Sequence, residues 1–141
     1  MAKKRAESNY TATIAESSRE LSPRERIMYK DLGNATKLND MAEEAMSAGA
    51  KAIITNIKDY AIISIHNEAS EDVDYKNYLI VDGNGDKYYT GSTAFWNSFK
   101  SIYDEMVYDE MAESGEEWGI QLNLIPSKNY AGKTVLTCSL I

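Results

Sequence analysis

The chain has few of the side chains that usually perform catalysis, and they are not grouped. It contains one cysteine, Cys138, and one histidine, His66, in 141 residues. An internal disulfide and a zinc site built from several Cys or His ligands are therefore excluded. Gly132-Lys133-Thr134 matches the end of a phosphate-binding loop, but Ser127 stands where that motif needs Gly, and a strand-like pattern follows. We expect no enzyme activity, no cofactor and no metal site.

Lysines and tyrosines alternate in several segments that we expect to form strands and their loops. The chain has ten tyrosines. Bases stack on aromatic rings, for about 1 to 3 kcal/mol each, while lysines neutralise phosphates, so this pattern favours a surface for single-stranded nucleic acid. The alternative is that strands favour Tyr anyway and that several rings fill the core. The candidate DNA-binding residues are Lys58, Tyr60, Tyr75, Lys76, Tyr78, Lys87, Tyr88, Tyr89, Lys128, Tyr130 and Lys133.

Charge is distributed unevenly along the chain. The net charge is -7, yet residues 1–30 carry +3, and seven acidic residues fall between Asp104 and Glu117 without a Lys or Arg. Such a run is usually a solvated surface. It could also imitate the phosphates of DNA, which gives an alternative function as an acidic inhibitor of a host nucleic-acid enzyme.

The composition indicates one globular domain, with 43% hydrophobic and 26% charged residues. No apolar run approaches the roughly 18 residues of a membrane span. The basic start Met1-Ala-Lys-Lys-Arg5 is followed by polar residues rather than by the apolar core of a signal peptide. We therefore expect a cytoplasmic protein that does not interact with membranes.

The first 49 residues are expected to lie outside the main domain. Residues 1–21 offer little to bury, so we predict a flexible basic arm. Ser22-Pro23-Arg24-Glu25 is typical of a helix start, with a capping box and Pro in the first turn, and predicts a helix to about Lys30 or Leu32. A second helix is expected over Asp40–Ala48, capped by Asn39. Residues 22–49 would form a short helical extension.

From residue 50 the pattern predicts strands and one long helix. Residues 52–57 and 60–65 are expected to pair with each other, residues 77–81 and 87–90 to form a hairpin around the glycines of 82–86, and residues 119–125 and 134–141 to form closing strands. A helix capped by Ser92 or Thr93 should run to about Met111, because Phe95, Phe99, Ile102 and Met106 recur at spacings of four, three and four and would form one buried face. This order is typical of an OB-fold, a five-stranded, partly open Greek-key barrel with a helix between strands 3 and 4. The expected fold is thus mainly β with helices, with the OB-fold in residues 50–141.

Three segments also carry a resemblance to a known family. They are Asn77-Tyr78-Leu79-Ile80-Val81-Asp82-Gly83, Tyr89-Thr90-Gly91-Ser92-Thr93-Ala94-Phe95-Trp96 and Tyr130-Ala131-Gly132-Lys133-Thr134. Together they resemble OB-fold single-stranded DNA-binding proteins of conjugative plasmids and phages of Gram-positive bacteria. The resemblance implies binding to single-stranded and also double-stranded DNA, and a role in plasmid transfer or mobile-element replication. Because base stacking and phosphate contacts are common to all sequences, we expect the binding to be independent of sequence.

The same resemblance implies self-association into oligomers or filaments, in which the N-terminal tail reaches a neighbouring subunit. The arm and the helix after it offer apolar and basic side chains for such a contact. The candidate oligomerisation residues are Tyr10, Ile14, Leu21, Arg24 and Arg26.

Overall fold

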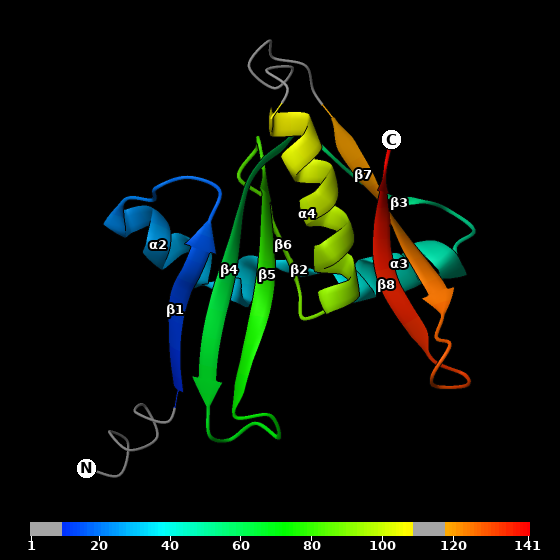
Figure 1. Ribbon diagram of the computed structural model, residues 1–141, viewed down its shortest axis with the longest axis horizontal. Helices are drawn as coiled ribbons and strands as arrows, with labels where there is room; N and C mark the ends of the chain where they lie inside the picture. Colours follow the sequence, from blue (N-terminus) through cyan, green and yellow to red (C-terminus); the bar gives the residue numbers. More distant parts are fainter. Residues whose placement is uncertain (1–9, 109–117) are drawn as a thin grey trace.

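The computed structural model describes residues 10–108 and 118–141 (Figure 1). Within these ranges the protein is a mixed α/β structure with three α-helices and eight strands. The helices are α2 (Pro23–Lys30), α3 (Leu38–Ser47) and α4 (Thr93–Tyr108), with a short 3-10 turn η1 (Leu32–Asn34). The strands are β1 (Tyr10–Ser17), β2 (Thr36–Lys37), β3 (Ala52–Thr55), β4 (Ile57–Asn67), β5 (Asp74–Asp82), β6 (Lys87–Thr90), β7 (Gly119–Pro126) and β8 (Thr134–Leu140).

The strands form two sheets with α4 between them (Figure 1). The larger sheet has the order β1-β4-β5-β6-β2, and the smaller one has the order β3-β7-β8. Neighbouring strands are antiparallel except for the short parallel pair of β2 and β6. Along the described chain, a strand of one sheet leads directly into a strand of the other only from β3 of the smaller sheet to β4 of the larger sheet.

A single residue, Asn56, makes the bend between β3 and β4. It has a positive φ of 55°, a conformation that Asn tolerates better than most residues. The turn at Gly83 packs closely against it, because a Cβ on Gly83 would lie 2.1 Å from the Asn56 side-chain nitrogen. Gly119 is equally constrained, since its Cβ would lie 2.5 Å from the carbonyl oxygen of Ile54.

This bend corrects the expected pairing of residues 52–57 with residues 60–65. The two runs are consecutive parts of one bent strand: β3 pairs with β7, whereas β4 pairs with β1 and β5. The intervening Lys58-Asp59 is not a turn. Asp59 is buried and remains within β4.

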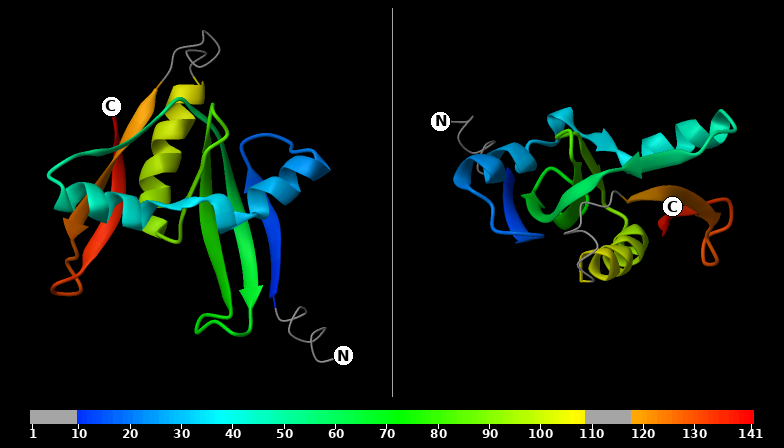
Figure 2. Two further views of the ribbon diagram at one scale, coloured as in Figure 1. Left: turned by 180° about the vertical axis from the view of Figure 1, so that it is seen from behind. Right: turned by 90° about the horizontal axis from the view of Figure 1, so that it is seen from above.

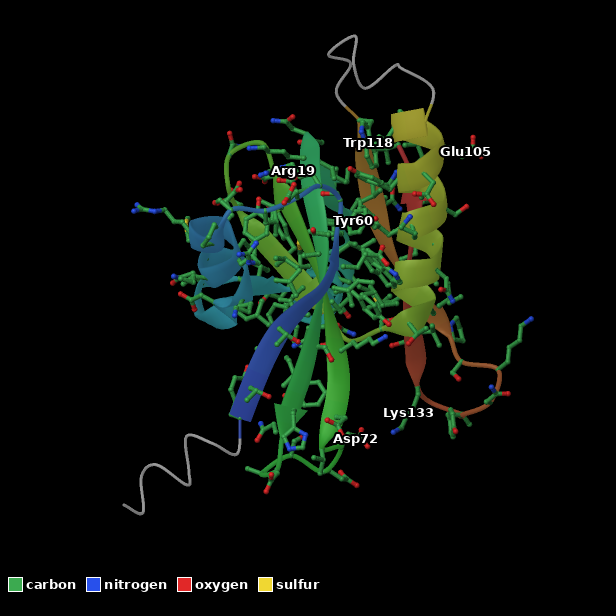
Figure 3. All side chains as sticks on the ribbon, turned by 60° about the vertical axis from the view of Figure 1, so that its left-hand side comes forward. Arg19, Tyr60, Asp72, Glu105, Trp118 and Lys133 are labelled. Carbon is green, nitrogen blue, oxygen red and sulfur yellow. The ribbon has the colours of Figure 1, made fainter. Side chains whose placement is uncertain are left out.

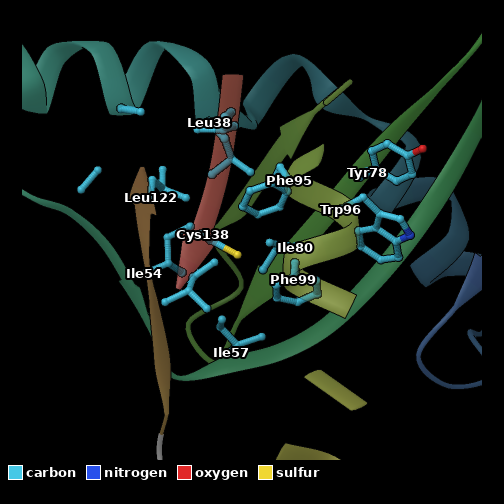
Figure 4. Close-up of a cluster of buried hydrophobic side chains, with 14 of the residues drawn as sticks. Leu38, Ile54, Ile57, Tyr78, Ile80, Phe95, Trp96, Phe99, Leu122 and Cys138 are labelled. Atoms are coloured by element: carbon cyan, nitrogen blue, oxygen red, sulfur yellow. The ribbon is translucent and has the colours of Figure 1, made fainter. Parts of the chain in front are cut away.

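The main core fills the space between the two sheets and α4 (Figure 4). Phe95 and Phe99 of α4 are fully buried, which confirms the face predicted from their spacing. Leu38 at the start of α3 is also fully buried in this cluster. The helical extension is therefore packed into the domain rather than attached beside it.

A second apolar cluster lies on the opposite face of the larger sheet, which we call the outer face. Leu21 and Tyr29 are buried here against side chains of β4 and β5. β1 extends the same sheet by pairing with β4 over most of its length. The predicted flexible arm is therefore wrong for residues 10–17, because a partner distant in sequence supplies the hydrogen bonds of β1. Residues 1–9 lie outside the described residues.

A buried carboxylate fastens the segment after β1 to the outer face. Asp59 accepts hydrogen bonds from Ser18 Oγ at 3.1 Å, Arg19 Nη2 at 3.1 Å and Tyr29 Oη at 2.8 Å. The Arg19 guanidinium also donates to the Glu25 carboxylate. Because these donors come from the loop before α2 and from α2 itself, Asp59 fixes both to β4.

The two N-terminal helices differ in how closely they follow the expectation. α2 has the predicted capping box of Ser22 and Glu25. α3 begins at Leu38, earlier than predicted, after Lys37 and without a side-chain cap. Asn39, the predicted cap, instead accepts a hydrogen bond from Thr90 Oγ1 at 2.7 Å.

The long helix has the predicted cap, because Ser92 Oγ accepts from the backbone N–H of Phe95. The predicted end of this helix near Met111 falls outside the described residues. None of the helices in the described ranges is long and apolar enough to cross a membrane.

We expect the substitution Asp59→Asn to destabilise the protein by about 2 kcal/mol, because it removes a buried charge partner and leaves donors without acceptors. Urea unfolding measures the loss. Asp72→Asn, at an exposed loop position, is the control and should leave stability unchanged. Equal stability of both variants would show that the Asp59 contacts do not hold the extension in place.

Acid should reduce the stability that the Glu25 carboxylate gives to the start of α2, in a defined pH range. The hydrogen bond from Arg19 and the Ser22 backbone N–H lower the Glu25 pKa from 4.5 to about 2. Its stabilising contribution is present above pH 4.5 and is lost as the pH falls towards 2. In urea unfolding, Glu25→Gln should therefore be less stable than the original protein at neutral pH, with the difference shrinking in acid. A difference independent of pH would contradict this.

Candidate nucleic-acid interface

Two of the predicted stacking tyrosines belong to the core. Tyr78 is 8% exposed and stacks on Trp96, with ring centroids 4.9 Å apart. Tyr60 is also buried and meets Trp96 and Tyr103 edge to face, at 5.1 and 4.9 Å. Both rings lie on the sheet face that α4 covers, so the prediction that they stack on bases is wrong.

Two further candidates are engaged in contacts within the chain. The Tyr88 hydroxyl donates to Asp82 Oδ2 at 3.2 Å, and burial is the main cause that raises its pKa to about 12. Lys87 Nζ donates to the carbonyl oxygens of Met28, at 2.7 Å, and Asp31. Lys87 thus neutralises the C-terminal end of α2, a structural role that cations often take there.

Tyr75 and Tyr89 lie on the outer face, at the border of the second apolar cluster. Both are half-buried, so part of each ring remains accessible. Lys37 of β2 is paired with Tyr89 and exposed, which places a cation beside this ring. The sequence reasoning missed Lys37, because a two-residue strand between two turns of helix has no periodicity to detect.

The loop between β7 and β8 is the most exposed group of candidates. Tyr130 is 67% exposed, and Lys128 and Lys133 are exposed on either side of it. Ser127 Oγ accepts from the backbone N–H groups of Asn129 and Tyr130, at 3.3 and 3.2 Å, which orders the start of the loop. A ring and two cations are therefore presented to solvent from an ordered turn.

This loop projects from the same end of the molecule as the β4–β5 loop, as the positions of Lys133 and Asp72 show (Figure 3). Tyr75 and Lys76 follow that second loop at the start of β5 and point to opposite faces of the sheet. Five of the predicted residues thus lie towards one end of the molecule, on or next to two loops that are well separated along its longest axis (Figure 1). We call them the loop surface: Tyr75, Lys76, Lys128, Tyr130 and Lys133.

Lys58 is separate from this group. It lines a groove of about 550 Å³ together with Tyr103 and Trp118. Trp118 lies at the end of the molecule opposite Lys133 (Figure 3). Lys58 therefore cannot share a short binding site with the loop surface.

Acidic groups also occur at the end that carries the loop surface. His66 contacts Asp74 at 2.7 Å and Glu68 at 3.2 Å. The hydrogen bond to Asp74, and then that to Glu68, raise the pKa of His66 above its usual value. His66 therefore has structural contacts near the end of β4. The β4–β5 loop is acidic, whereas the β7–β8 loop carries two lysines and no acid.

Only the first two residues of the predicted acidic patch, Asp104 and Glu105, lie within the described residues. Asp104 pairs with Lys100 at 2.5 Å, and both acids are exposed on α4. Across the described ranges, no group of three or more potential ligands could hold a metal ion. Cys138 is buried in the core, and this burial raises its thiol pKa to about 12.

The candidate oligomerisation residues differ widely in accessibility. Leu21 is buried within its own chain and Ile14 packs against the second cluster, so the contact predicted for Leu21 is wrong. Tyr10 and Arg24 are exposed. Arg26 is exposed as well, but its Nη1 donates to the carbonyl oxygen of Leu21 at 2.6 Å.

Comparison with family models, with curated proteins and with solved structures finds no match for this chain. Its function must therefore be argued from the arrangement of its own residues.

The difference in burial predicts that two of the candidate tyrosines contribute differently to the stability of the protein. Tyr78→Ala should destabilise the protein by about 3 kcal/mol, because it leaves a cavity beside Trp96. Tyr130→Ala should leave stability within about 0.5 kcal/mol, since the ring is exposed. Thermal unfolding of the two variants measures this. A large loss for Tyr130→Ala would show that its ring has a structural role.

Proposed function

We propose that the protein is a non-catalytic DNA-binding protein that coats single-stranded DNA without sequence preference, uses the loop surface to do so, and self-associates through its N-terminal segment. The observation that carries the proposal is the exposed group of Lys128, Tyr130 and Lys133 on the loop between β7 and β8. The resemblance of the sequence supports a role in conjugative transfer or in replication of a mobile element.

The strand pairing supports an OB-fold as the scaffold. If the bent unit of β3 and β4 is counted as strand 1, then β5, β6, β7 and β8 are strands 2 to 5, and α4 lies between strands 3 and 4. The pairs 1–2, 2–3, 1–4 and 4–5 of that fold are then all present. OB-folds bind oligonucleotides with the face of strands 2 and 3 and with the loops 1–2 and 4–5.

Two features differ from a simple barrel of this kind. Strands 3 and 5 are not paired in the described structure: β2 occupies the edge of β6, while α4 packs against β8. In addition, α2 and η1 cover much of the outer face of strands 1 to 3. DNA on that face would be restricted to its uncovered border at Tyr75 and Tyr89. The loop between strands 4 and 5, which is the β7–β8 loop, would therefore make most of the contacts with DNA.

In this mechanism the aromatic rings and the lysines act together. A base would stack on Tyr130, and a base further along the same strand on the accessible part of Tyr75. Lys76, Lys128 and Lys133 would neutralise phosphates and displace the counterions condensed on the strand. Such contacts use groups that all bases share, which explains binding without sequence preference. Duplex DNA offers the same phosphates but not the free bases.

The test is fluorescence anisotropy with a labelled single strand and a matched duplex at about 50 and 200 mM salt, where phosphate contacts weaken steeply. Tyr130→Ala should weaken single-strand binding by about 5- to 150-fold, which corresponds to the loss of one stacked base at 1 to 3 kcal/mol. Tyr130→Phe keeps the ring and should bind normally. No binding to single strands at low salt would overturn the proposal.

The lysines are tested by the salt dependence of the same binding. Lys128→Ala with Lys133→Ala should reduce the slope of log K against log salt by about 1.4, because single strands give about 0.7 per phosphate contact. Lys51→Ala with Lys58→Ala removes two exposed cations elsewhere and should leave the slope nearly unchanged. Equal slopes for both double variants would exclude the β7–β8 loop as the phosphate site. Equal affinity for duplex and single strand would indicate a general DNA-binding protein.

A further inference from the structure

The two short N-terminal helices carry opposite charge and lie towards opposite ends of the molecule. α2 and α3 are separated along its longest axis (Figure 1), and the chain between them crosses one side of the domain (Figure 2, left). The sequence of α2 holds three basic residues and one acid, Glu25, which is paired with Arg19. That of α3 holds three acids, Asp40, Glu43 and Glu44, and no basic residue.

Each helix also exposes apolar side chains beside its charges. On α2, Ile27 is 68% and Met28 is 56% exposed. They follow Arg24 by three and four residues and so share a helix face with it. On α3, Met46 is 57% exposed and follows Glu43 by three residues. The same combination of an apolar residue and a charge therefore occurs on both helices, with the sign of the charge reversed.

A groove adjoins α3 on the side of Met46. It has a volume of about 480 Å³ and runs between α3 and β7. Its walls are mostly small or apolar, and its lining includes Ala42, Ala45, Met46, Lys51, Leu122 and Leu124. A groove of this kind can accept two aliphatic side chains from a helix that lies along its rim.

We propose that α2 of one copy docks on α3 of the next, with Ile27 and Met28 in the groove and Arg24 opposite Glu43. The proposal refines the self-association included in the proposed function and rests on it, but it does not involve DNA contacts. The two surfaces are different and lie towards opposite ends, so the contact is head to tail. A contact of this type repeats without closing unless its rotation happens to form a ring, and it generates filaments.

Charge reversals on α2 and α3 test both that these helices form the contact and that they contact each other. Arg24→Glu and Glu43→Arg should each weaken self-association about tenfold, because an attractive pair at the rim becomes a repulsive one. Glu44→Lys makes the same kind of charge change on the other flank of α3 and is the matched control. The weight-average mass is measured by light scattering over a range of concentrations at low salt without DNA. Thermal unfolding checks that each exposed variant remains folded.

Restoration of the contact gives the sharpest result. An equal mixture of Arg24→Glu and Glu43→Arg proteins, and the double variant carrying both changes, should recover the mass of the original protein, since every contact again joins opposite charges. A contact between two α2 helices predicts instead that Glu43→Arg associates normally, which would overturn the proposal. A monomer at every concentration, or single variants with unchanged mass, would overturn it as well. If such a monomer still bound single-stranded DNA, only the docking would be wrong.

Discussion

The rest of the structure depends on the bend at Asn56, where one strand passes from the smaller sheet into the larger. A positive φ at this residue is compatible with the close packing of Gly83 and with the crossing of β7 at Gly119. With both sheets anchored on one bent strand, the space between them has to be filled by apolar side chains, and the aromatic face of α4 fills it. A larger residue at Gly119 would separate β3 from β7 and open the core on that side.

The burial of Asp59 has a consequence for binding. A carboxylate on the outer face would be unfavourable without partners, and the partners come from the loop before α2 and from α2. The same contacts hold Leu21 and Tyr29 over a face that could otherwise receive a ligand. The extension therefore stabilises the sheet and at the same time leaves only part of the Tyr75 and Tyr89 rings accessible on the face it covers.

Local signals in the sequence predicted local structure well. The capping box of α2, the spacing of Phe95 and Phe99, and the glycine turn after β5 each depend on neighbouring residues, and all are present. The pairing of β1 and the bend at Asn56 depend on partners far along the chain, which propensities do not reveal. The prediction that Tyr60 and Tyr78 stack on bases was wrong for a related reason. Alternation along a strand shows which residues share a face of the sheet, but not which face another element covers, and Tyr78 is covered by Trp96 of α4.

A chain with a net charge of -7 can bind a polyanion only where its cations are segregated from its acids, as on the β7–β8 loop, which carries two lysines and no acid. Placing α2 on α3 would pair acids of one copy with cations of the next, so the docking would leave the net charge of each copy unchanged and would not use the lysines of this loop. A repeated head-to-tail contact would also present the β7–β8 loops of successive copies at regular intervals along one strand. DNA bound by several loops would hold neighbouring copies together, and docked copies would offer adjacent sites. Each equilibrium would then favour the other by the same factor, which is the thermodynamic origin of cooperative coating.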